Sequence, residues 1–557
     1  MTPGLPPMGD ARMPIRHMLC RSWLPALALV ALFGVAHAQP SQAPEMTPDE
    51  FAEATQVYFD RCAGCHGALR GGATGPDLFP ARLAEKGMPY LQAIMFGGLP
   101  GGMPGWGAQG VMSMEDIEVM ARFLLNEPPA PAQISLDQIL ETWVVHVAPE
   151  DRPSEPQHEL DWEDFFGVIL RDMGQVAIVD GASKELVSLV ETGYAIHILR
   201  ASATGRYFTS IGRDGKASLI DLWMHPPQVV AEVKPCYDAR SIESSKFSGF
   251  EDQYAIVGCY WPALAVVLDG HTLEPLKMIG TAGYERGAGA YVEEARVAAI
   301  VASHFHPEWI VNVKEAGQTW FVDYSRLDEP GQPLPVTMVD TDLYLHDGGW
   351  AGHRYFVVAA NQLNKVVVID ALERTVAAEV EAGTIPHPGR GANWVHPEFG
   401  PVWATGNLGS MEMTVIGADP EGNPEHAWQA VARVEVPYTG NLFLKTHPAS
   451  PWIIYDFVMS PSLVGAATLC AIDRERLDEQ VCWEVAGATD VNARMVHIEF
   501  NRDGSEFWVS AWGRMDTPSF IVVYDAVTLE EGHRIEGDWV RTPTGKFNAY
   551  NTAHDVY

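Results

Sequence analysis

Basic side chains are scarce in this chain. Of its 557 residues only 37 are Lys or Arg, whereas 72 are Asp or Glu, which gives a formal net charge of −35. A surface of this sign repels the phosphates of nucleic acids and the head groups of anionic membranes, and it attracts basic proteins. The composition therefore argues against nucleic acid or an anionic membrane as a partner and favours a small basic protein.

Long apolar runs are also lacking, except near the N-terminus. The apolar stretch Trp23–Val35 follows three arginines and precedes Ala36-His37-Ala38. It is too short to span a bilayer, which needs ~20 residues, but a basic start, a short apolar run and an A-x-A site are typical of a secretory signal peptide. We therefore expect residues 1–38 to be removed on export, no membrane span in the mature chain, and a periplasmic location.

Cysteines are few. Of the seven, one lies in the expected signal peptide and two in a motif described below, which leaves Cys236, Cys259, Cys470 and Cys482. These four can pair in an oxidising compartment, and Cys470 and Cys482 flank a hairpin-like stretch that would let them face each other. Spacing does not fix connectivity, so buried single thiols remain an equal alternative.

The sequence pattern changes near residue 132. Before it, Thr47-Pro48 starts a predicted helix that ends at Arg61, and Ser113 caps a second that ends near Leu125. Prolines at 128, 129 and 131 make a stiff linker. We expect a helical domain of residues 39–132 and a separate domain of residues 133–557.

The second region contains a repeat. A short run of β-forming residues ends in Asp, followed by a polar turn and another run, and the copies lie 41 to 54 residues apart. A blade of four antiparallel strands needs about 40–50 residues, so eight copies predict an eight-bladed β-propeller. A large β-sandwich is the alternative, but it need not give a regular period. The eight aspartates are Asp180, Asp221, Asp269, Asp323, Asp370, Asp419, Asp473 and Asp525.

The strongest local motif is C-x-x-C-H at Cys62–His66. Two thiols three residues apart can form thioethers to both vinyl groups of a haem, and His66 can then bind the iron. Zinc would need further ligands, and no second C-x-x-C exists. A thioredoxin-like redox pair would need a βαβ pattern that is absent here. The motif therefore predicts covalent haem c in a helical domain of the class I c-type cytochrome kind.

A sixth iron ligand is expected at Met103, which lies in the Gly/Pro-rich loop 101–105 and not on a helix face. Met95, Met112 and Met120 are competitors, but they fit helical or core positions. A His/Met pair raises the haem potential and suits electron transfer.

Three histidines of the second region stand in distinctive segments: His197, His346 and His387. Each is a lone histidine, and most lone histidines are satisfied surface or loop residues. Arginines also fall at expected strand ends or loops of different blades, where they either converge into a cationic pocket or lie on the surface. These arginines are Arg171, Arg200, Arg213, Arg240 and Arg390.

The order of motifs along the whole chain resembles the cytochrome cd1 nitrite reductases. The resemblance covers the mature chain, is weakest over residues 450–500, and has His497 where a Gln is common. The matching segments include Cys62-Ala-Gly-Cys-His-Gly, Leu170-Arg-Asp-Met-Gly-Gln, Ala302-Ser-His-Phe-His-Pro, Leu345-His-Asp-Gly-Gly-Trp, Pro386-His-Pro-Gly-Arg-Gly-Ala-Asn and Thr542-Pro-Thr-Gly-Lys-Phe-Asn.

This resemblance implies a second, non-covalent cofactor, haem d1, at the centre of the propeller. His197 would bind its iron, and His346 and His387 would face the substrate from the other side. The five arginines would hold its carboxylates, with Tyr260, Thr544 and Gly545 lining the pocket. The resemblance also implies a homodimer, reduction of oxygen to water as a side activity, and electrons supplied by a small basic c-type cytochrome or a cupredoxin.

The implied reaction reduces nitrite to nitric oxide and water with one electron and two protons. Two imidazoles with an ordinary pKa of ~6.5 can each donate a proton near neutral pH. Asp347 beside His346 either helps to keep that ring protonated or caps an exposed turn. Two other functions remain open: a dehydrogenase that completes haem d1 synthesis, and a haem-carrying electron-transfer protein without turnover.

Overall fold

Five helices form the N-terminal part of the computed structural model, which describes residues 43–72, 75–99, 103, 105–108, 110–130, 133–287, 289–329 and 333–557. The expected signal peptide lies outside these residues, and the expected domain boundary at 132 borders a gap. Within the described ranges no helix combines the length and apolarity that crossing a bilayer requires. The helices are α1 (Pro48–Arg61), α2 (Ala63–His66), α3 (Pro80–Ala84), α4 (Met88–Gly97) and α5 (Met114–Leu124).

Both predicted helix starts are confirmed. Thr47 and Glu50 form a reciprocal capping box at the start of α1, with Pro48 in its first turn. Ser113 and Asp116 do the same for α5. The inward faces of α1 and α5 share one apolar core, because the side chains of Tyr58 on α1 and of α5 belong to the same buried cluster.

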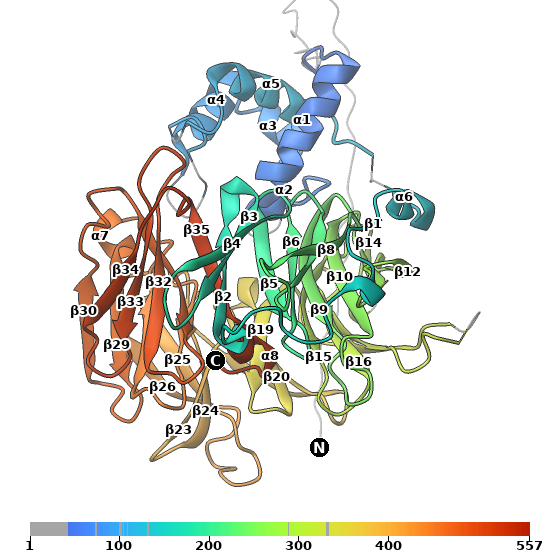
Figure 1. The fold of residues 1–557 in the computed structure, drawn as a ribbon. Helices are drawn as coiled ribbons and strands as arrows, with labels where there is room; N and C mark the ends of the chain where they lie inside the picture. Colours follow the sequence, from blue (N-terminus) through green and yellow to red (C-terminus); the bar gives the residue numbers. More distant parts are fainter. Residues whose placement is uncertain are drawn as a thin grey trace, which may run out of the picture. The chain divides into compact units, whose positions relative to one another are not determined.

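Eight antiparallel blade sheets follow, seven of four strands and one of five, so the predicted eight-bladed propeller is confirmed (Figure 1). The blades along the chain are β2 (Phe165–Leu170), β3 (Gln175–Asp180), β4 (Leu186–Glu191); β5 (Ile196–Ala201), β6 (Tyr207–Gly212), β7 (Ala217–Asp221), β8 (Gln228–Val233); β9 (Asp238–Ser244), β10 (Tyr254–Trp261), β11 (Leu264–Asp269), β12 (Pro275–Gly280); β15 (Val297–Ala302), β16 (Glu308–Val313), β17 (Gln318–Asp323), β18 (Val336–Asp340); β19 (Leu345–Ala351), β20 (Tyr355–Ala360), β21 (Lys365–Asp370), β22 (Thr375–Glu381); β23 (Ala392–His396), β24 (Gly400–Thr405), β25 (Glu412–Gly417), β26 (Ala430–Glu435); β27 (Leu444–Lys445), β28 (Trp452–Asp456), β29 (Thr468–Asp473), β30 (Gln480–Glu484); and β31 (Arg494–Phe500), β32 (Glu506–Trp512), β33 (Phe520–Asp525), β34 (Glu531–Ile535).

Short elements accompany the blades. Strand β1 adds to the outer edge of the second blade beside β8, and β13 pairs with β14 in a separate hairpin. The short elements are α6 (Leu136–Leu140), β1 (Val144–Val145), η1 (Pro149–Asp151), η2 (Trp162–Asp164), η3 (Arg171–Met173), β13 (Gly283–Tyr284), β14 (Tyr291–Val292), η4 (Asn361–Leu363), α7 (Leu463–Ala466) and α8 (Ala549–Ala553).

The C-terminal strand closes the ring. Strand β35 (Pro543–Asn548) pairs antiparallel with β2, so the first blade takes its innermost strand from the end of the chain. Between the first and last blades, the rings of Phe166 and Trp508 stack at 3.9 Å. Backbone pairing and apolar packing therefore hold the two ends of the propeller together.

The repeated aspartate has a structural reason. It ends the third strand of seven blades and follows the third strand, β25, in the sixth. In all eight blades its carboxylate accepts a hydrogen bond from the backbone N–H of a residue two or three positions further along, which turns the chain toward the fourth strand. The period of the repeat is thus the period of this turn.

Two disulfides join the four cysteines whose pairing the sequence left open. One links Cys236 to Cys259, and the other links Cys470 to Cys482. Cys470 and Cys482 lie directly opposite each other on β29 and β30, which agrees with the hairpin suggested by their spacing.

Candidate active site

The C-x-x-C-H motif lies at the junction of two helices. Cys62 ends α1 and precedes α2, and its carbonyl accepts hydrogen bonds from the amides of Cys65 and His66. This tight turn brings both thiols, neither of which is in a disulfide, to one segment of the chain. The spacing therefore gives the arrangement that two thioether bonds to one haem require.

His66 is oriented for metal binding. Its ring is buried, and its Nδ1 lies 2.8 Å from the carbonyl oxygen of Pro76. Since a carbonyl only accepts, Nδ1 carries the hydrogen and Nε2 offers its lone pair, which is the arrangement that metal-binding histidines generally have. Burial lowers the pKa of His66, which keeps the ring neutral. A Cβ at Gly75 would lie 2.8 Å from this ring, so the glycine is required here.

Met103 packs, half-buried, against the same apolar cluster as Cys62. Its carbonyl accepts a hydrogen bond from the amide of Leu99 at 3.1 Å. Its competitors Met95, Met112 and Met120 are all buried in that core. Met103 is therefore the most accessible of the four.

In the propeller, His346 and His387 face one another across a shared carboxylate. Their ring centroids are 5.2 Å apart, with His346 on the inner strand β19 and His387 just before β23. Asp347 Oδ1 lies 3.0 Å from His346 Nδ1, and Asp347 Oδ2 lies 3.4 Å from His387 Nδ1. His387 Nδ1 also lies 3.0 Å from the carbonyl oxygen of Leu442. Both Nδ1 atoms therefore carry hydrogens, and each ring presents Nε2 away from Asp347.

Two expectations for this pair need correction. Burial lowers the pKa of His346 to about 4, because loss of solvation outweighs the attraction of Asp347. His346 therefore does not have the ordinary value near 6.5 that the sequence suggested. Asp347 is not an exposed turn cap: it also accepts a hydrogen bond from the amide of Gly389 at 2.7 Å. Burial would raise the pKa of Asp347, but His387 and His346 together lower it, so the carboxylate is ionised.

His197 occupies the start of β5 among positive charges. Loss of solvation lowers its pKa well below the ordinary value even though solvent still reaches the ring, and Arg240, Arg213, His346 and Arg171 lower it further. A neutral imidazole whose side chain remains accessible can offer a nitrogen lone pair to a metal. The pKa of His197 therefore responds to His346, and His346 and His387 contact each other directly.

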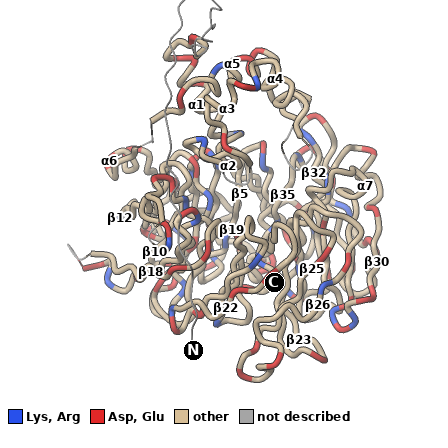
Figure 2. Tube along the Cα trace, turned by 180° about the vertical axis from the view of Figure 1, so that it is seen from behind, with Lys and Arg blue, Asp and Glu red and all other residues tan. Residues whose placement is uncertain are grey.

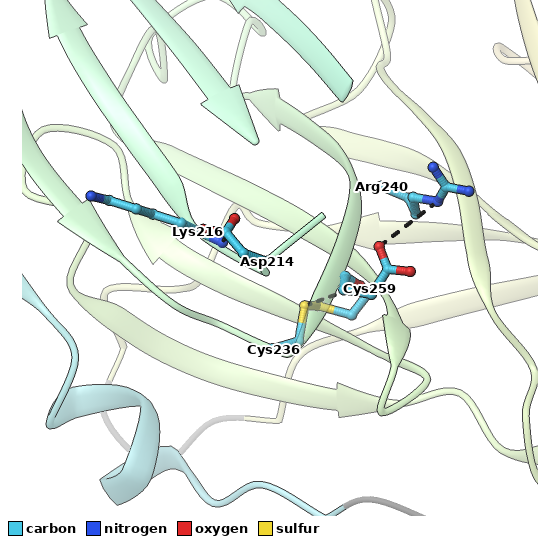
Figure 3. The surroundings of a disulfide bond; sticks show 6 residues. Asp214, Lys216, Cys236, Arg240 and Cys259 are labelled. Carbon is cyan, nitrogen blue, oxygen red and sulfur yellow. Dashed lines mark hydrogen bonds and ion pairs between the residues drawn. A yellow bond between two sulfur atoms is a disulfide. The ribbon is translucent and has the colours of Figure 1, made fainter. Parts of the chain in front are cut away.

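Four of the five predicted arginines lie near two shared carboxylates. Arg200 and Arg390 lie 3.9 and 3.8 Å from Glu243. Arg213 and Arg240 lie 3.1 and 3.9 Å from Asp238. Figure 3 shows Arg240 joined to that carboxylate beside the disulfide of Cys236 and Cys259.

This cluster has excess positive charge. Burial, and then Arg390, lowers the pKa of Arg200 to about 9, so it still carries its charge at neutral pH. The buried Nε atoms of Arg200 and Arg240 have no hydrogen-bond partner. Buried charges are stable only when paired, so the cluster fits a ligand with several carboxylates.

The remaining predicted residues, Tyr260, Thr544, Gly545 and Arg171, do not share a common partner. Arg240 lies over the Tyr260 ring at 4.7 Å. Thr544 and Gly545 lie on β35, the inner strand of the first blade. Arg171 pairs with its neighbour Asp172 at 2.5 Å. Its positive charge also lowers the pKa of His197.

The sequence does not single out Glu243, Asp238 or Lys546, and it marks His497 only as a departure from the family pattern. Glu243 and Asp238, the partners of the arginines, gave no signal because single acidic residues are common in this chain. His497 on β31 is buried, and its Nδ1 accepts a hydrogen bond from the amide of Lys546 at 3.3 Å. Lys546 is itself fully buried and donates to two carbonyls and Ser510.

A helical domain with a C-x-x-C-H turn, joined to a propeller with a central His and Arg cluster, defines a protein that carries two haems. The family described as "Cytochrome D1 heme domain" matches residues 160–552, and the family described as "Cytochrome C oxidase, cbb3-type, subunit III" matches residues 49–124. The chain belongs to the cytochrome d1 haem domain family. Its cofactors are haem c in the helical domain and haem d1 in the propeller.

Relatives span nearly the full chain. A nitrite reductase of Stutzerimonas stutzeri is 42% identical in an alignment 556 residues long. The alignment covers 95% of this chain and 98% of that protein. A dihydro-haem d1 dehydrogenase of Pseudomonas aeruginosa is 27% identical and covers 94% of this chain and 97% of its own length. A solved structure of a dihydro-haem d1 dehydrogenase has a TM-score of 0.67 with 25% identity, over 89% of this chain and 99% of that one.

Proposed function

We propose that this protein is a nitric-oxide-forming nitrite reductase. The observation that carries the proposal is the His346–Asp347–His387 group, two imidazoles held by one carboxylate inside a d1-type propeller. The 42% identity to a nitrite reductase over nearly the whole chain supports it.

In the helical domain, Cys62 and Cys65 would hold haem c through thioethers. His66 and Met103 would be its two iron ligands. This assignment rests on the hydrogen bond that fixes the tautomer of His66 and on the packing of Met103 against the same core. A His/Met pair suits a haem that receives and passes on electrons.

In the propeller, His197 would bind the haem d1 iron. The arginine cluster would neutralise the carboxylates of the macrocycle, since its guanidinium groups outnumber the carboxylates around them. Tyr260, Thr544 and Gly545 would line the site. The cluster comprises Arg171, Arg200, Arg213, Arg240 and Arg390.

The reaction is NO₂⁻ + e⁻ + 2H⁺ → NO + H₂O. Haem d1, when bound, supplies the iron at which nitrite is held and the electron that reduces it. His346 and His387 supply the protons from Nε2, because Asp347 and the Leu442 carbonyl engage both Nδ1 atoms. A bound anion beside the buried ring of His346 raises the pKa of that ring, so nitrite itself promotes its protonation. The two N–H groups then bind and protonate the oxygen that leaves as water.

A dihydro-haem d1 dehydrogenase is the second candidate, favoured by the shared domain order and the TM-score of 0.67. Purified protein with both haems, a reduced donor and nitrite distinguishes the two. Nitric oxide formed in proportion to added nitrite supports the proposal. Oxidation of added dihydro-haem d1 without nitric oxide formation would support the dehydrogenase instead.

The cellular setting is proposed from the sequence. The expected signal peptide at 1–38 supports export to the periplasm. Acidic positions occur in both the helical part and the blades (Figure 2), which supports a basic cytochrome or cupredoxin as the electron donor, mainly through the rate of association. A homodimer is proposed from the family resemblance alone.

A further inference from the structure

Two side chains of the segment just before β15, Glu294 and Arg296, contact the backbone around the C-x-x-C-H motif. The carboxylate of Glu294 accepts hydrogen bonds from the amides of Ala68 and Leu69, at 2.5 and 2.8 Å, just after His66. The guanidinium of Arg296 lies 3.4 Å from the carbonyl of Ala63, between the two cysteines. Propeller side chains therefore hold this segment on both sides of His66.

Arg296 is itself fixed. Its Nη2 and Nε lie 2.5 and 2.9 Å from Glu315 Oε1, and its backbone amide donates to Glu315 Oε2 at 2.8 Å. Its side chain is only 2% exposed. It also lies 3.8 Å from Glu294, so Glu294, Arg296 and Glu315 form one buried ionic group, which we call the clamp.

Contacts of the clamp join the haem c segment to the arginine cluster proposed to hold haem d1. Arg296 lies over the ring of Tyr260 at 4.8 Å, and Arg240 lies over the same ring at 4.7 Å. A second route starts at the carbonyl of Phe59 in α1, which accepts a hydrogen bond from Arg213 at 3.0 Å. Arg213 pairs with Asp238, which also faces Arg240. Both routes end at Arg240.

We propose that Glu294 and Arg296 are positioning residues that set the haem c segment against the propeller and so control electron transfer from haem c to haem d1. Ordinary domain packing would not require buried charges at this place, since a buried ionic group is weak as a source of stability. Its geometric effect is specific, because it fixes the backbone on each side of the proposed iron ligand. The proposal rests on the proposed function only in assigning the direction of electron flow.

The test compares Glu294→Gln, Glu294→Asp and Arg296→Lys in the protein carrying both haems. Photoreduction of haem c, followed through the absorbance bands of both haems, gives the transfer rate without nitrite. Glu329→Gln and Arg326→Lys are matched controls, because Arg326 and Glu329 form an exposed ion pair of the same chemistry in the fourth blade. Haem content and thermal unfolding are measured on every variant.

We expect Glu294→Gln to slow haem-to-haem transfer several-fold, because the rate of electron tunnelling falls exponentially as the distance between the two haems grows. Glu294→Asp and Arg296→Lys, which keep the charge, should lose less, and the controls should match the wild type. Equal transfer rates in wild type and in all clamp variants that load both haems would overturn the proposal. The transfer assay contains no nitrite, so its result does not depend on the proposed reaction. Failure of the wild type to form nitric oxide in a separate assay would refute the proposed function but would not affect the measured transfer rates.

Discussion

Replacing Asp347 with Asn tests the proton-donating pair directly. The carboxylate lies 3.0 Å from His346 Nδ1 and 3.4 Å from His387 Nδ1, so the substitution removes a negative charge that faces both rings. This charge favours protonation of His346. The change keeps the size of the side chain and one acceptor oxygen. It therefore alters charge with little change in packing.

The size of the effect follows from the hydrogen bond that is weakened. A hydrogen bond to a charged group contributes about 1.5–3 kcal/mol, which equals about one to two pKa units at 1.36 kcal/mol per unit. The pKa of His346, already lowered to about 4 by burial, should fall further. The protonated fraction, and with it nitrite turnover, should then fall about 10- to 100-fold near neutral pH.

The assay is nitric oxide release from pH 5 to 8 with a reduced donor in excess. We expect the activity of Asp347→Asn to shift toward lower pH by about one to two units, because more acid is needed to charge the same ring. Asp340→Asn, at an exposed position of β18, is the matched control. A pH profile and rate equal to those of the wild type would refute the role given to Asp347.

Other substitutions test separate parts of the site and fold. His387→Ala should keep both haems and slow nitrite turnover about 100-fold or more, whereas His533→Ala on the exposed part of β34 should not; unchanged turnover would remove His387 from the reaction. His197→Ala should lose or misplace haem d1 while haem c stays, so an unaltered d1 absorption spectrum would reject it as ligand. Cys482→Ser should cost about 3 kcal/mol of unfolding free energy for a loop of this length, measured by denaturant titration, with turnover unchanged; equal stability would show that this disulfide adds little.

The fold was predictable because its repeat is local. Each aspartate from Asp180 to Asp525 bonds to amides within a few residues of itself, so the turn that defines a blade leaves its trace in a short stretch of sequence. The helix caps at Thr47 and Ser113 are local for the same reason. The C-x-x-C-H motif and the histidine segments could likewise be recognised within single short stretches.

The partners of the site residues were not predictable, since they join distant parts of the chain. Glu294 meets the amides of Ala68 and Leu69 across more than 220 residues. Among 72 acidic residues, nothing in the sequence distinguishes Glu243, which faces Arg200 and Arg390. The pKa of His346 depends on burial, which the sequence around a lone histidine does not reveal.

The charge distribution explains how an acidic protein can bind an anionic cofactor and an anionic substrate. Although the whole chain carries −35, Arg200, Arg213, Arg240 and Arg390 are gathered around two carboxylates in the propeller. Surface charges are screened by salt within about 10 Å at 0.1 M, whereas buried groups are screened much less. An anion inside the ring therefore experiences mainly the arginines, while a basic partner outside experiences mainly the acidic surface. Raising the salt concentration should accordingly slow electron delivery by a basic donor far more than it weakens retention of haem d1.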